Sequence, residues 1–384
     1  MSGKAKADQL KHRKRNRIIL IIELVILLVL LAALFVWLKF GMINFRDIGT
    51  VQPGKISKKT EKTLSGYTNF MVFGVDNRKA GNYTTGNTDV QIIVSINNDT
   101  KKIRMASLYR DTIVDIDPTG NSKFAKCNAA YAYGGEKEAM EMVNENLELN
   151  LDKFVTVDFR AVSDVVDDVG GLEIDVTPAE LQALNSKPLV QEVARASGKT
   201  PKLVTKSGLQ TLNGDQVTAY CRIRHTAGGD FTRASRQRKV MNLLLQKVKK
   251  ASLTQLNSII DDVLPKISTN FSGTEILSMA TAAKSYEIDK SFGFPFDKTT
   301  ATINPYGSIV IPCTLSTNVE KLHNKMFDEV DYTPNNTVNA ISQQIVNITG
   351  MTEQSAVDYS SSEDNKGIDD TTTTTSDSES TTRQ

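Results

Sequence analysis

The 384-residue sequence has little of the material that builds covalent or histidine-rich frameworks. Its three cysteines, Cys127, Cys221 and Cys313, are too few for a disulfide framework in a chain of this length. Its three histidines leave little material for a histidine-rich metal centre. The sequence also contains no GxSxG elbow, no Walker A loop and no internal repeat. These absences argue against a serine-elbow hydrolase, a P-loop nucleotide enzyme and a repeat architecture.

A strong net charge is also absent, although the charge is unevenly distributed. The 46 lysines and arginines nearly balance 44 aspartates and glutamates, so the net charge of +2 says little about partners. Residues 1–17 contain several basic residues and only one acidic residue, Asp8. The basic residues there are Lys4, Lys6, Lys11, Arg13, Lys14, Arg15 and Arg17. Residues 18–38 are apolar except for Glu23, and a run of this length can span the hydrocarbon core of a membrane.

This arrangement predicts a single-pass membrane anchor. Residues 1–17 are a basic cytoplasmic tail, residues 18–38 are the transmembrane helix, and everything after about residue 40 lies outside the cytoplasm. Trp37 and Phe40 suit the far membrane interface. The alternative is a cleaved signal peptide. The apolar run is too long for a typical signal peptide, and no small-residue cleavage site follows it.

Three further regions follow the anchor. Residues 39–66 are expected to form a short linker that keeps the folded part close to the membrane. Residues 67–330 are expected to form one mixed domain. Residues 331–384 are a C-terminal extension, disordered from about residue 352 because Ser, Thr, Asp and Glu dominate and too few apolar residues remain to pack.

Strand and helix patterns alternate along the mixed domain. We expect strands at residues 69–76, 90–96, 102–108, 153–159 and 172–176. The second and third of these are joined by a hairpin turn at residues 97–100. We expect helices at residues 136–147, 160–168, 231–250 and 274–286. This interleaving favours an α/β or an α+β fold with helices on both faces of a sheet.

The most informative stretch of the chain is residues 221–239, which contain five arginines. Alternation of residue types over residues 217–224 predicts a strand that places Arg222 and Arg224 on one face. A pair of glycines then makes a turn, and Asp230 is the expected N-cap of the next helix. The arginines therefore lie where a strand is predicted to end and a helix to begin.

In this predicted helix an apolar stripe continues into cationic residues. The stripe consists of Val240, Leu243, Leu244 and Val248. Extended toward the helix start at spacings of three and four, it passes through Gln237, Arg236 and Arg233. Buried charge is costly unless it is paired, a helix N-terminus attracts anions, and arginine suits planar contact with phosphate oxygens. We therefore expect a site for a multiply charged anion such as a diphosphate. The alternative is a set of solvated arginines with a few internal salt bridges.

Carboxylates stand next to the ends of the predicted strands. Asp76 ends the first strand and Asp89 precedes the second, while Arg110 ends the third. Two separated carboxylates beside a phosphate site suit Mg²⁺, which binds one or two carboxylates together with substrate phosphate. The alternative is that each is a loop carboxylate paired with Arg78 or Arg110. His225 adjoins the arginines in sequence and is a further candidate base.

Seven motifs in this order resemble the LytR-CpsA-Psr family: GVDNR, TDVQIIVSIN, SLYRDT, KCNAAYAYGG, DFRAVSDVVDDVGGLEIDV, LNGDQVTAYCRIR and GDFTRASRQR. The similarity covers about residues 68–245 and extends more weakly to about residue 330. The resemblance implies an α/β/α sandwich with a central mixed sheet, in which the core holds a polyprenyl chain. It implies a cell-wall glycopolymer ligase that transfers a glycan 1-phosphate from polyprenyl diphosphate to peptidoglycan, with Mg²⁺ or Mn²⁺ at the diphosphate.

The resemblance also implies roles for individual residues. Asp76 and Asp89 match the metal-linked acids. The implied catalytic set consists of Asp89, Arg78, Arg110 and Arg224. The implied diphosphate-binding set consists of Arg110, Arg222, Arg224, Arg233, Arg236 and Gln237. Tyr109 departs from the family pattern, because proline often precedes the arginine at this place.

The sequence leaves several functional alternatives open. The implied donor is a teichoic acid or a capsular or wall polysaccharide, and nothing in the sequence separates these. A regulatory protein that binds polyprenyl diphosphate would need the arginines but not the acids, and a lipid diphosphatase would use water in place of a sugar hydroxyl. No nucleic-acid partner is expected, because the predicted topology puts the domain outside the cytoplasm. Asp89 is the candidate acceptor of the hydroxyl proton.

Overall fold

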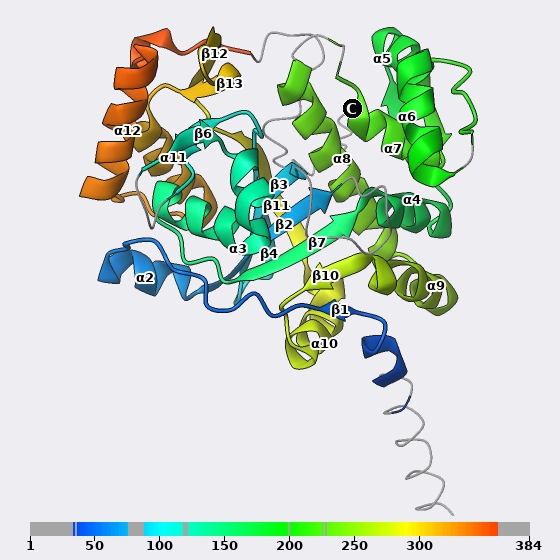
Figure 1. Cartoon of the computed structure of the whole chain (residues 1–384). Coiled ribbons are helices and arrows are strands. Elements are labelled where there is room, and N and C mark those ends of the chain that lie inside the picture. The colour runs from blue at the N-terminus through cyan, green and yellow to red at the C-terminus, as the bar shows by residue number, and fades with distance from the viewer. Residues whose placement is uncertain are drawn as a thin grey trace, which may run out of the picture.

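The computed structural model describes residues 34, 37–75, 88–117, 122–198, 200–224, 226 and 229–359. These residues form an α/β fold around a central mixed sheet (Figure 1). The strands are β1 (Asn44–Phe45), β2 (Tyr67–Val75), β3 (Thr88–Asn97), β4 (Lys102–Leu108), β5 (Ile113–Asp115), β6 (Phe124–Lys126), β7 (Lys153–Asp158), β8 (Leu172–Val176), β9 (Gly208–Leu212), β10 (Ile267–Thr269), β11 (Glu287–Phe294), β12 (Lys298–Ile303) and β13 (Gly307–Pro312).

Helices connect most of these strands. The α-helices are α2 (Lys58–Leu64), α3 (Asn128–Leu147), α4 (Phe159–Asp168), α5 (Pro178–Leu184), α6 (Lys187–Ser197), α7 (Gly214–Arg222), α8 (Gly229–Lys249), α9 (Leu253–Val263), α10 (Gly273–Ala282), α11 (Leu315–Phe327) and α12 (Asn336–Thr349). Single 3₁₀ turns are η1 (Leu264–Lys266), η2 (Ala283–Ser285) and η3 (Glu353–Ser355).

Seven strands make up the central sheet, in the order β1-β10-β7-β2-β3-β4-β11. The pairs β1–β10, β7–β2 and β4–β11 are parallel, whereas β10–β7, β2–β3 and β3–β4 are antiparallel. β3 and β4 are the two strands predicted at residues 90–96 and 102–108, and a tight turn joins them as expected. Parallel and antiparallel neighbours in one sheet confirm the predicted mixed sheet.

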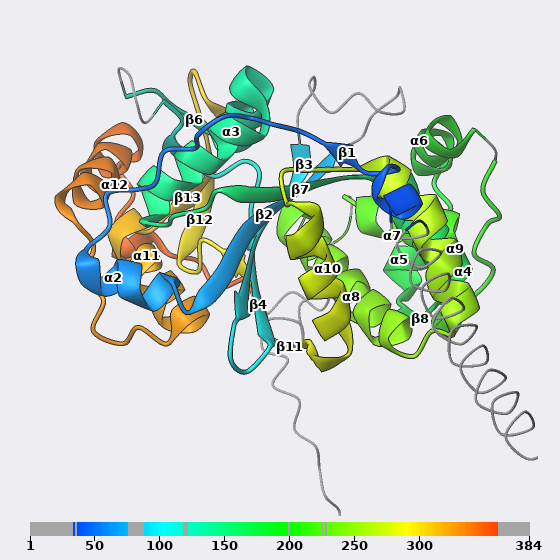
Figure 2. The ribbon, with the colours of Figure 1, turned by 90° about the horizontal axis from the view of Figure 1, so that it is seen from below.

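Helices cover both faces of this sheet. On one face Phe73 and Ile93 pack in a large apolar core that α3, α11 and α12 also fill. On the opposite face Val94 packs near Met241 and Leu245 of α8. Figure 2 shows the strands between these two helical layers, so the fold has three layers. The chain therefore buries both faces of its central strands, which is why those strands are apolar on both sides.

A further apolar core lies beside the sheet. It is shared by α4, α5, α6, α7 and the hairpin of β8 and β9. Figure 1 shows these four helices together at one side of the molecule. α8 packs on this core through the predicted stripe of Val240, Leu243, Leu244 and Val248. The second half of α8 therefore contacts both this core and the sheet.

The strand predicted at residues 217–224 is wrong, because this segment is helical. α7 runs over Gly214–Arg222, and the helix ends at Ile223. The helix begins at a capping box in which Asn213 and Gln216 bind each other's backbone N–H groups. Gly214 permits contact with α4, since a Cβ there would lie 2.1 Å from the Ser163 carbonyl oxygen. Alternation failed as a guide because both faces of this short helix are buried.

The packed unit is longer at both ends than predicted. Within the predicted linker, β1 pairs with β10 and Val51 is buried in the main core. Beyond residue 330, α12 contributes Ile341 and Ile345 to the same core. The predicted start of disorder at about residue 352 is too early, because η3 follows and Tyr359 packs on Phe231.

The predicted transmembrane helix falls almost wholly outside the described residues. Only Leu34, Trp37 and Leu38 of residues 18–38 are described, and all three are exposed. Within the described part of the chain, no helix is both long enough and apolar enough to cross a membrane.

Candidate functional site

The centre of the candidate site is a contact between Asp89 of β3 and Arg110, just after β4. The antiparallel register pairs Ile92 with Ser107, and extending it by three residues places Asp89 opposite Arg110. Asp89 Oδ1 accepts a hydrogen bond from Arg110 Nη1 at 2.6 Å. The hairpin geometry alone therefore brings together an acid and an arginine that stand 21 residues apart.

A β-bulge directs Asp89 into the site. β2 pairs Gly74 with Val90 and Val75 with Thr88, so Asp89 is the extra residue between two paired neighbours. Gly74 is needed here, because a Cβ at this position would lie 2.8 Å from the Cβ of Val90. Thr88 stabilises the bulge through hydrogen bonds from its hydroxyl to the carbonyl oxygens of Gly74 and Val90.

Arg110 is held by a rigid turn after β4. Tyr109 donates its backbone N–H to the Phe294 carbonyl oxygen at 3.0 Å, and Thr112 donates to the Tyr109 carbonyl oxygen. Proline at position 109 would lack the first of these hydrogen bonds. The Tyr109 ring lies against Gly293, where a Cβ would meet the tyrosine hydroxyl at 1.9 Å. The departure from the family pattern therefore fits its surroundings.

The first turns of α8 supply a second arginine and a second carboxylate. Arg233 Nη2 lies 2.8 Å from Asp230 Oδ1, and Arg110 Nε lies 3.6 Å from the same oxygen. Arg224, between α7 and α8, reaches Asp89 Oδ2 at 3.1 Å. Arg110, Arg224 and Arg233 thus surround Asp89 from three different segments of the chain.

Charge and burial shift the pKa values of this cluster in different directions. Burial raises the pKa of Asp89, but the charges of Arg233, Arg110 and Arg224 lower it by a larger amount. The net pKa therefore lies below the usual value. Burial dominates at Asp230, whose pKa is raised. Burial also lowers the pKa of Arg233. Asp89 is therefore a firmly ionised carboxylate, whereas Arg233 bears a cost for being charged.

Two guanidinium nitrogens in the cluster, Arg110 Nε and Arg233 Nη1, are buried without a hydrogen-bond acceptor among the described residues. The Arg233 side chain is 4% exposed, and its Nη1 is buried with no hydrogen-bond acceptor among the described residues. A buried guanidinium nitrogen without an acceptor is unfavourable. Arg233 lies in the first turns of a helix, where backbone N–H groups and the helix dipole also favour an anion.

Arg222 and Arg224 line a pocket of about 430 Å³ between α5 and α6. Arg222 is buried at the end of α7, where its guanidinium lies 4.8 Å from the Phe159 ring centroid and 3.7 Å from Glu192. The rest of the wall is largely apolar and includes Pro188, Leu189 and Ile223. The arginine cluster therefore adjoins a cavity of the size of a small-molecule site.

Arg236 and Gln237 point inward as predicted but do not join the cluster. Arg236 is buried and donates to Glu180 at 2.7 Å and to Thr226 at 2.8 Å. Gln237 donates to the Cys221 carbonyl oxygen at 3.3 Å. Both side chains tie α8 to the helices beside it. The alternative of internal salt bridges thus describes Arg236 well, whereas the idea of solvated arginines does not.

Some predicted site residues cannot be placed. Asp76, Arg78 and His225 lie outside the described residues. Among the residues that are described, no group of three or more His, Cys, Asp or Glu side chains could hold a metal ion. Sequence reasoning treated Asp230 only as a helix cap, although its carboxylate contacts both Arg110 and Arg233. The i, i+3 spacing of Asp230 and Arg233 was the available signal.

A comparison with known families matches this chain over most of the fold just described. Residues 47–308 match the family model described as the LytR_cpsA_psr family, and this is more than half of the chain. The chain belongs to the LytR_cpsA_psr family. The matched range contains every residue of the arginine cluster, whereas α11, α12 and the C-terminal segment lie beyond it.

Two of the curated relatives that this chain resembles carry different kinds of name. The polyisoprenyl-teichoic acid–peptidoglycan teichoic acid transferase TagV of Bacillus subtilis is 31% identical over 253 residues, which are 65% of this chain and 61% of TagV. Biofilm regulatory protein A of Streptococcus mutans is 31% identical over 59% of this chain and 54% of that protein. The chain thus spans less than two thirds of the length of these relatives.

Solved structures share the fold. The crystal structure of B. subtilis TagV aligns with a TM-score of 0.53 at 27% identity and covers 70% of this chain and 98% of TagV. The protein gbs0355 of Streptococcus agalactiae aligns with a TM-score of 0.58 at 27% identity, over 73% of this chain and 92% of that chain. TagT bound to LIIa-WTA aligns with a TM-score of 0.51 at 22% identity, over 69% of this chain and 92% of TagT, which shows the fold alone.

Proposed function

We propose that this protein transfers a glycan 1-phosphate from a polyprenyl-diphosphate-linked wall polymer to a hydroxyl of peptidoglycan, and releases polyprenyl phosphate. The observation that carries the proposal is the buried Arg233, whose Nη1 lacks an acceptor among the described residues, in a cluster with Arg110 and Arg224. Phosphate oxygens are acceptors that match guanidinium geometry. The names of the TagV and TagU relatives support a wall teichoic acid as the polymer.

The arginines account for the chemistry that the transfer requires. The acceptor hydroxyl must approach a phosphorus atom that carries negative charge, and charge then shifts to the leaving polyprenyl phosphate. Arg110, Arg224 and Arg233 come from three segments and can contact different oxygens of one diphosphate. Such fixed cations stabilise a transition state more than they stabilise free substrate. No covalent intermediate on the protein is needed.

Carboxylates pair with these arginines within the cluster. Asp89 binds Arg110 and Arg224, while Asp230 binds Arg233. A diphosphate must displace some of these contacts. A divalent cation at Asp89 would neutralise this carboxylate and leave the arginines for the substrate. The donor set fits Mg²⁺ or Mn²⁺, since Mg²⁺ needs only one or two carboxylates when phosphates supply further oxygens. We propose that Asp89 and Asp76 hold the ion, which would withdraw charge from the phosphate.

Asp89 is also the proposed acceptor of the hydroxyl proton, with two conditions. Its pKa is below the usual value because the arginines outweigh its burial, and a carboxylate of low pKa is a weak base. Proton acceptance therefore requires that the metal ion not fully engage Asp89 and that the substrate's phosphate take over Arg110 and Arg224. The same displacement couples substrate binding to activation of the base.

The lipid chain needs an apolar path away from the diphosphate. The pocket between α5 and α6 begins at Arg222 and Arg224 and continues along Pro188, Leu189 and Ile223. We propose that the first isoprene units leave through this pocket. The domain would then act close to the membrane, held by a single anchor at residues 18–38 with the amino end in the cytoplasm.

The direct test is transfer by the purified protein. A short-chain lipid-linked glycan diphosphate and peptidoglycan fragments are incubated with the protein and Mg²⁺, and the products are weighed by mass spectrometry. A peptidoglycan fragment heavier by one glycan phosphate is the expected product. Free glycan phosphate alone would favour the diphosphatase. If neither product forms with several donors, the transferase proposal fails.

A second candidate function is a regulatory protein that binds polyprenyl diphosphate without turnover. The similarity to biofilm regulatory protein A favours it. A binder needs Arg110, Arg224 and Arg233 but has no use for Asp89 as a base. Tight binding of the lipid diphosphate by the Asp89→Asn protein, with no turnover by the unmodified protein, would select this function.

A further inference from the structure

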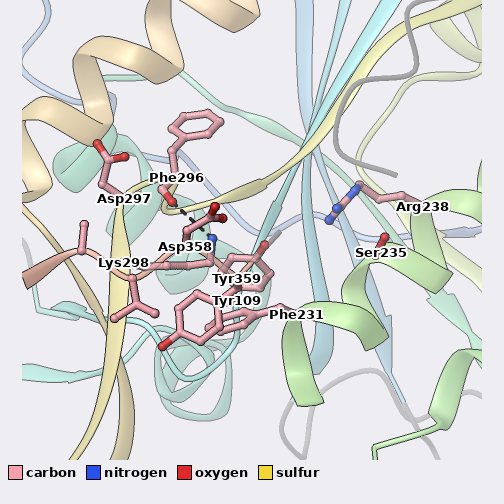
Figure 3. A pocket seen from close by; sticks show the side chains of 11 residues that line it. Tyr109, Phe231, Ser235, Arg238, Phe296, Asp297, Lys298, Asp358 and Tyr359 are labelled. Atoms are coloured by element: carbon pink, nitrogen blue, oxygen red, sulfur yellow. Dashed lines mark hydrogen bonds between the residues drawn. The ribbon is translucent and has the colours of Figure 1, made fainter. Parts of the chain in front are cut away.

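A second pocket lies on the other side of the first turns of α8. It has a volume of about 350 Å³ and is lined by Tyr109, Phe231, Ser235, Arg238, Phe296, Asp297, Lys298, Ala356, Val357, Asp358 and Tyr359. Figure 3 shows Ser235 and Arg238 of α8 on one side and Phe296 and Lys298 on the other. The last wall is residues 356–359, which we call the C-terminal strap.

The strap is held in place by specific contacts. Val357 donates its backbone N–H to the Lys298 carbonyl oxygen at 2.9 Å. The Tyr359 ring packs on Phe231 with centroids 4.7 Å apart, and Phe231 packs on Tyr109 at 4.6 Å. The strap lies beyond residues 47–308, which match the family model. This wall of the pocket therefore comes from the C-terminal extension and not from the matched part of the chain.

The pocket is joined to the arginine cluster through the backbone. Tyr109 immediately precedes Arg110, and Phe231 immediately follows Asp230. The same two backbone segments therefore carry both the rings of this pocket and two residues of the cluster. Substrate parts that adjoin the diphosphate are the first sugar of the donor and the acceptor sugar that attacks it.

The lining chemistry suits a neutral, hydroxylated ring. Tyr359 and Phe296 are half-buried and can offer a flat face to the C–H groups of a sugar, while Tyr109 and Phe231 are buried behind Tyr359. Polar groups around these rings can bind the sugar hydroxyls. Ser235 is 3% exposed, and its hydroxyl has no hydrogen-bond partner among the described residues. Two cations, Arg238 and Lys298, face two carboxylates, Asp297 and Asp358. Balanced charge of this kind favours neither a second phosphate nor an apolar lipid chain.

Lys298 supports the rings and does not serve as an anion site. Its ammonium lies 5.3 Å from the Tyr109 ring, 5.1 Å from the Phe231 ring and 5.7 Å from the Tyr359 ring. It also donates to the Phe296 carbonyl oxygen at 3.2 Å. These cation–π contacts fix the rings in one arrangement, which lowers the entropy cost of stacking a ligand on them.

We propose that this pocket is a subsite for a neutral sugar ring of the glycan substrate, and that the C-terminal strap completes it. The inference rests on the proposed transfer function, and it adds that Ser235, Phe296 and Tyr359 contact sugar and not phosphate. The sugar can belong to the donor or to the acceptor, and the experiment separates the two.

The test compares two truncations of the full-length protein in detergent. One chain ends after residue 359 and keeps the strap, and the other ends after residue 355 and lacks it. KM is measured for a lipid-linked glycan donor and for a peptidoglycan disaccharide–peptide acceptor, and pyrophosphate binding is measured separately. We expect loss of the strap to raise one KM by about 3- to 10-fold, as the loss of an aromatic contact predicts, with pyrophosphate binding unchanged. A change in donor KM assigns the donor sugar, and a change in acceptor KM assigns the acceptor sugar.

Point variants keep the test independent of any loss of folding. Tyr359→Ala should repeat the effect of the shorter truncation, Tyr359→Phe should retain more of the affinity, and Ser235→Ala should raise the same KM. Tyr133→Ala, at a tyrosine that is 66% exposed, is the matched control and should change neither KM. Unchanged KM values in all strap variants, or a selective loss of pyrophosphate binding, would overturn the subsite.

Failure of the subsite and failure of the proposed function have different signatures. If unmodified protein shows no turnover, saturation-transfer NMR with the acceptor disaccharide and with the lipid-free glycan phosphate tests the subsite alone. Strap-dependent saccharide binding without turnover would keep the subsite and reject the transferase. Turnover with strap-independent KM values would keep the transferase and reject the subsite.

Discussion

Replacing Arg233 and Arg236 separately with Met should show that Arg233 serves the reaction and that Arg236 serves the stability of the fold. Both side chains are buried and both contact a carboxylate, Asp230 at 2.8 Å and Glu180 at 2.7 Å. They differ in what remains after the charge is removed. Asp230 is 22% exposed and keeps Arg110 at 3.6 Å, whereas Glu180 is 6% exposed and loses its arginine.

This difference sets the expected magnitudes. Arg236→Met leaves a buried carboxylate without its cation and should lower the free energy of unfolding by about 3 kcal/mol or more. Arg233→Met leaves a partly exposed carboxylate that retains an arginine, so the free energy of unfolding should change by less than about 1 kcal/mol. It removes a charge-assisted contact to diphosphate worth about 1.5–3 kcal/mol, which corresponds to a loss of about 10- to 100-fold in binding or transfer.

The assay measures both quantities on each protein. Urea unfolding followed by circular dichroism gives stability, and glycan transfer measured by mass spectrometry gives activity. We expect Arg233→Met to keep its stability and lose glycan transfer. We expect Arg236→Met to lose stability, while its folded fraction keeps glycan transfer. If Arg233→Met is strongly destabilised yet retains transfer, Arg233 forms a structural ion pair with Asp230. The proposal that its Nη1 binds a phosphate oxygen then fails.

Three further predictions concern the acid, the pH and the topology. Asp89→Asn should still bind the lipid diphosphate but lose most transfer, with excess Mg²⁺ restoring only part of it; equal transfer by this variant, with or without chelator, would show that neither charge nor metal matters here. Burial raises the pKa of Glu329, but a hydrogen bond from His323 and its charge bring the net pKa below the usual 4.5. Ionised Glu329 therefore stabilises the fold above about pH 4.5 and loses this effect as pH falls below that value. Glu329→Gln should flatten the decline in unfolding free energy over this acid range, and an equally steep decline would contradict this sign. Protease added to intact protoplasts should digest the folded part and spare the anchor; protection of the folded part would reverse the proposed topology.

Local sequence patterns predicted helices and strands well where the pattern continued over many residues or where the turn residues were distinctive. The hairpin at residues 97–100 was recognisable from its Asn and Asp residues and is present between β3 and β4. The strand at residues 153–159 and the helix at residues 160–168 are present as β7 and α4. Short elements with weak patterns, such as β10 and β12, were missed because only their neighbours in the sheet stabilise them.

The error at residues 217–224 has a definite physical cause. Alternation is a guide to structure only when one face is exposed, and here Val217, Thr218, Ala219, Tyr220, Cys221 and Arg222 are all buried. The capping box at Asn213 and Gln216 was the better signal, because it satisfies the free N–H groups of a helix start. The error changed the role of Arg222, which is buried beside Phe159, apart from Arg224, which reaches Asp89.

The sequence by itself determined the family, through seven ordered motifs, and the inward direction of Arg233 and Arg236, through the 3.6-residue period of a helix. The structure decided that Asp89 pairs with Arg110, which the sequence had offered only as the alternative to a metal site. Only the tertiary structure decided that Arg233 keeps a donor without an acceptor among the described residues, whereas Arg236 is paired with Glu180. This difference depends on carboxylates from distant segments of the chain. The tertiary structure also decided that the strap packs on Phe231, since a short segment outside any helix or strand acquires order only from the surface that it covers.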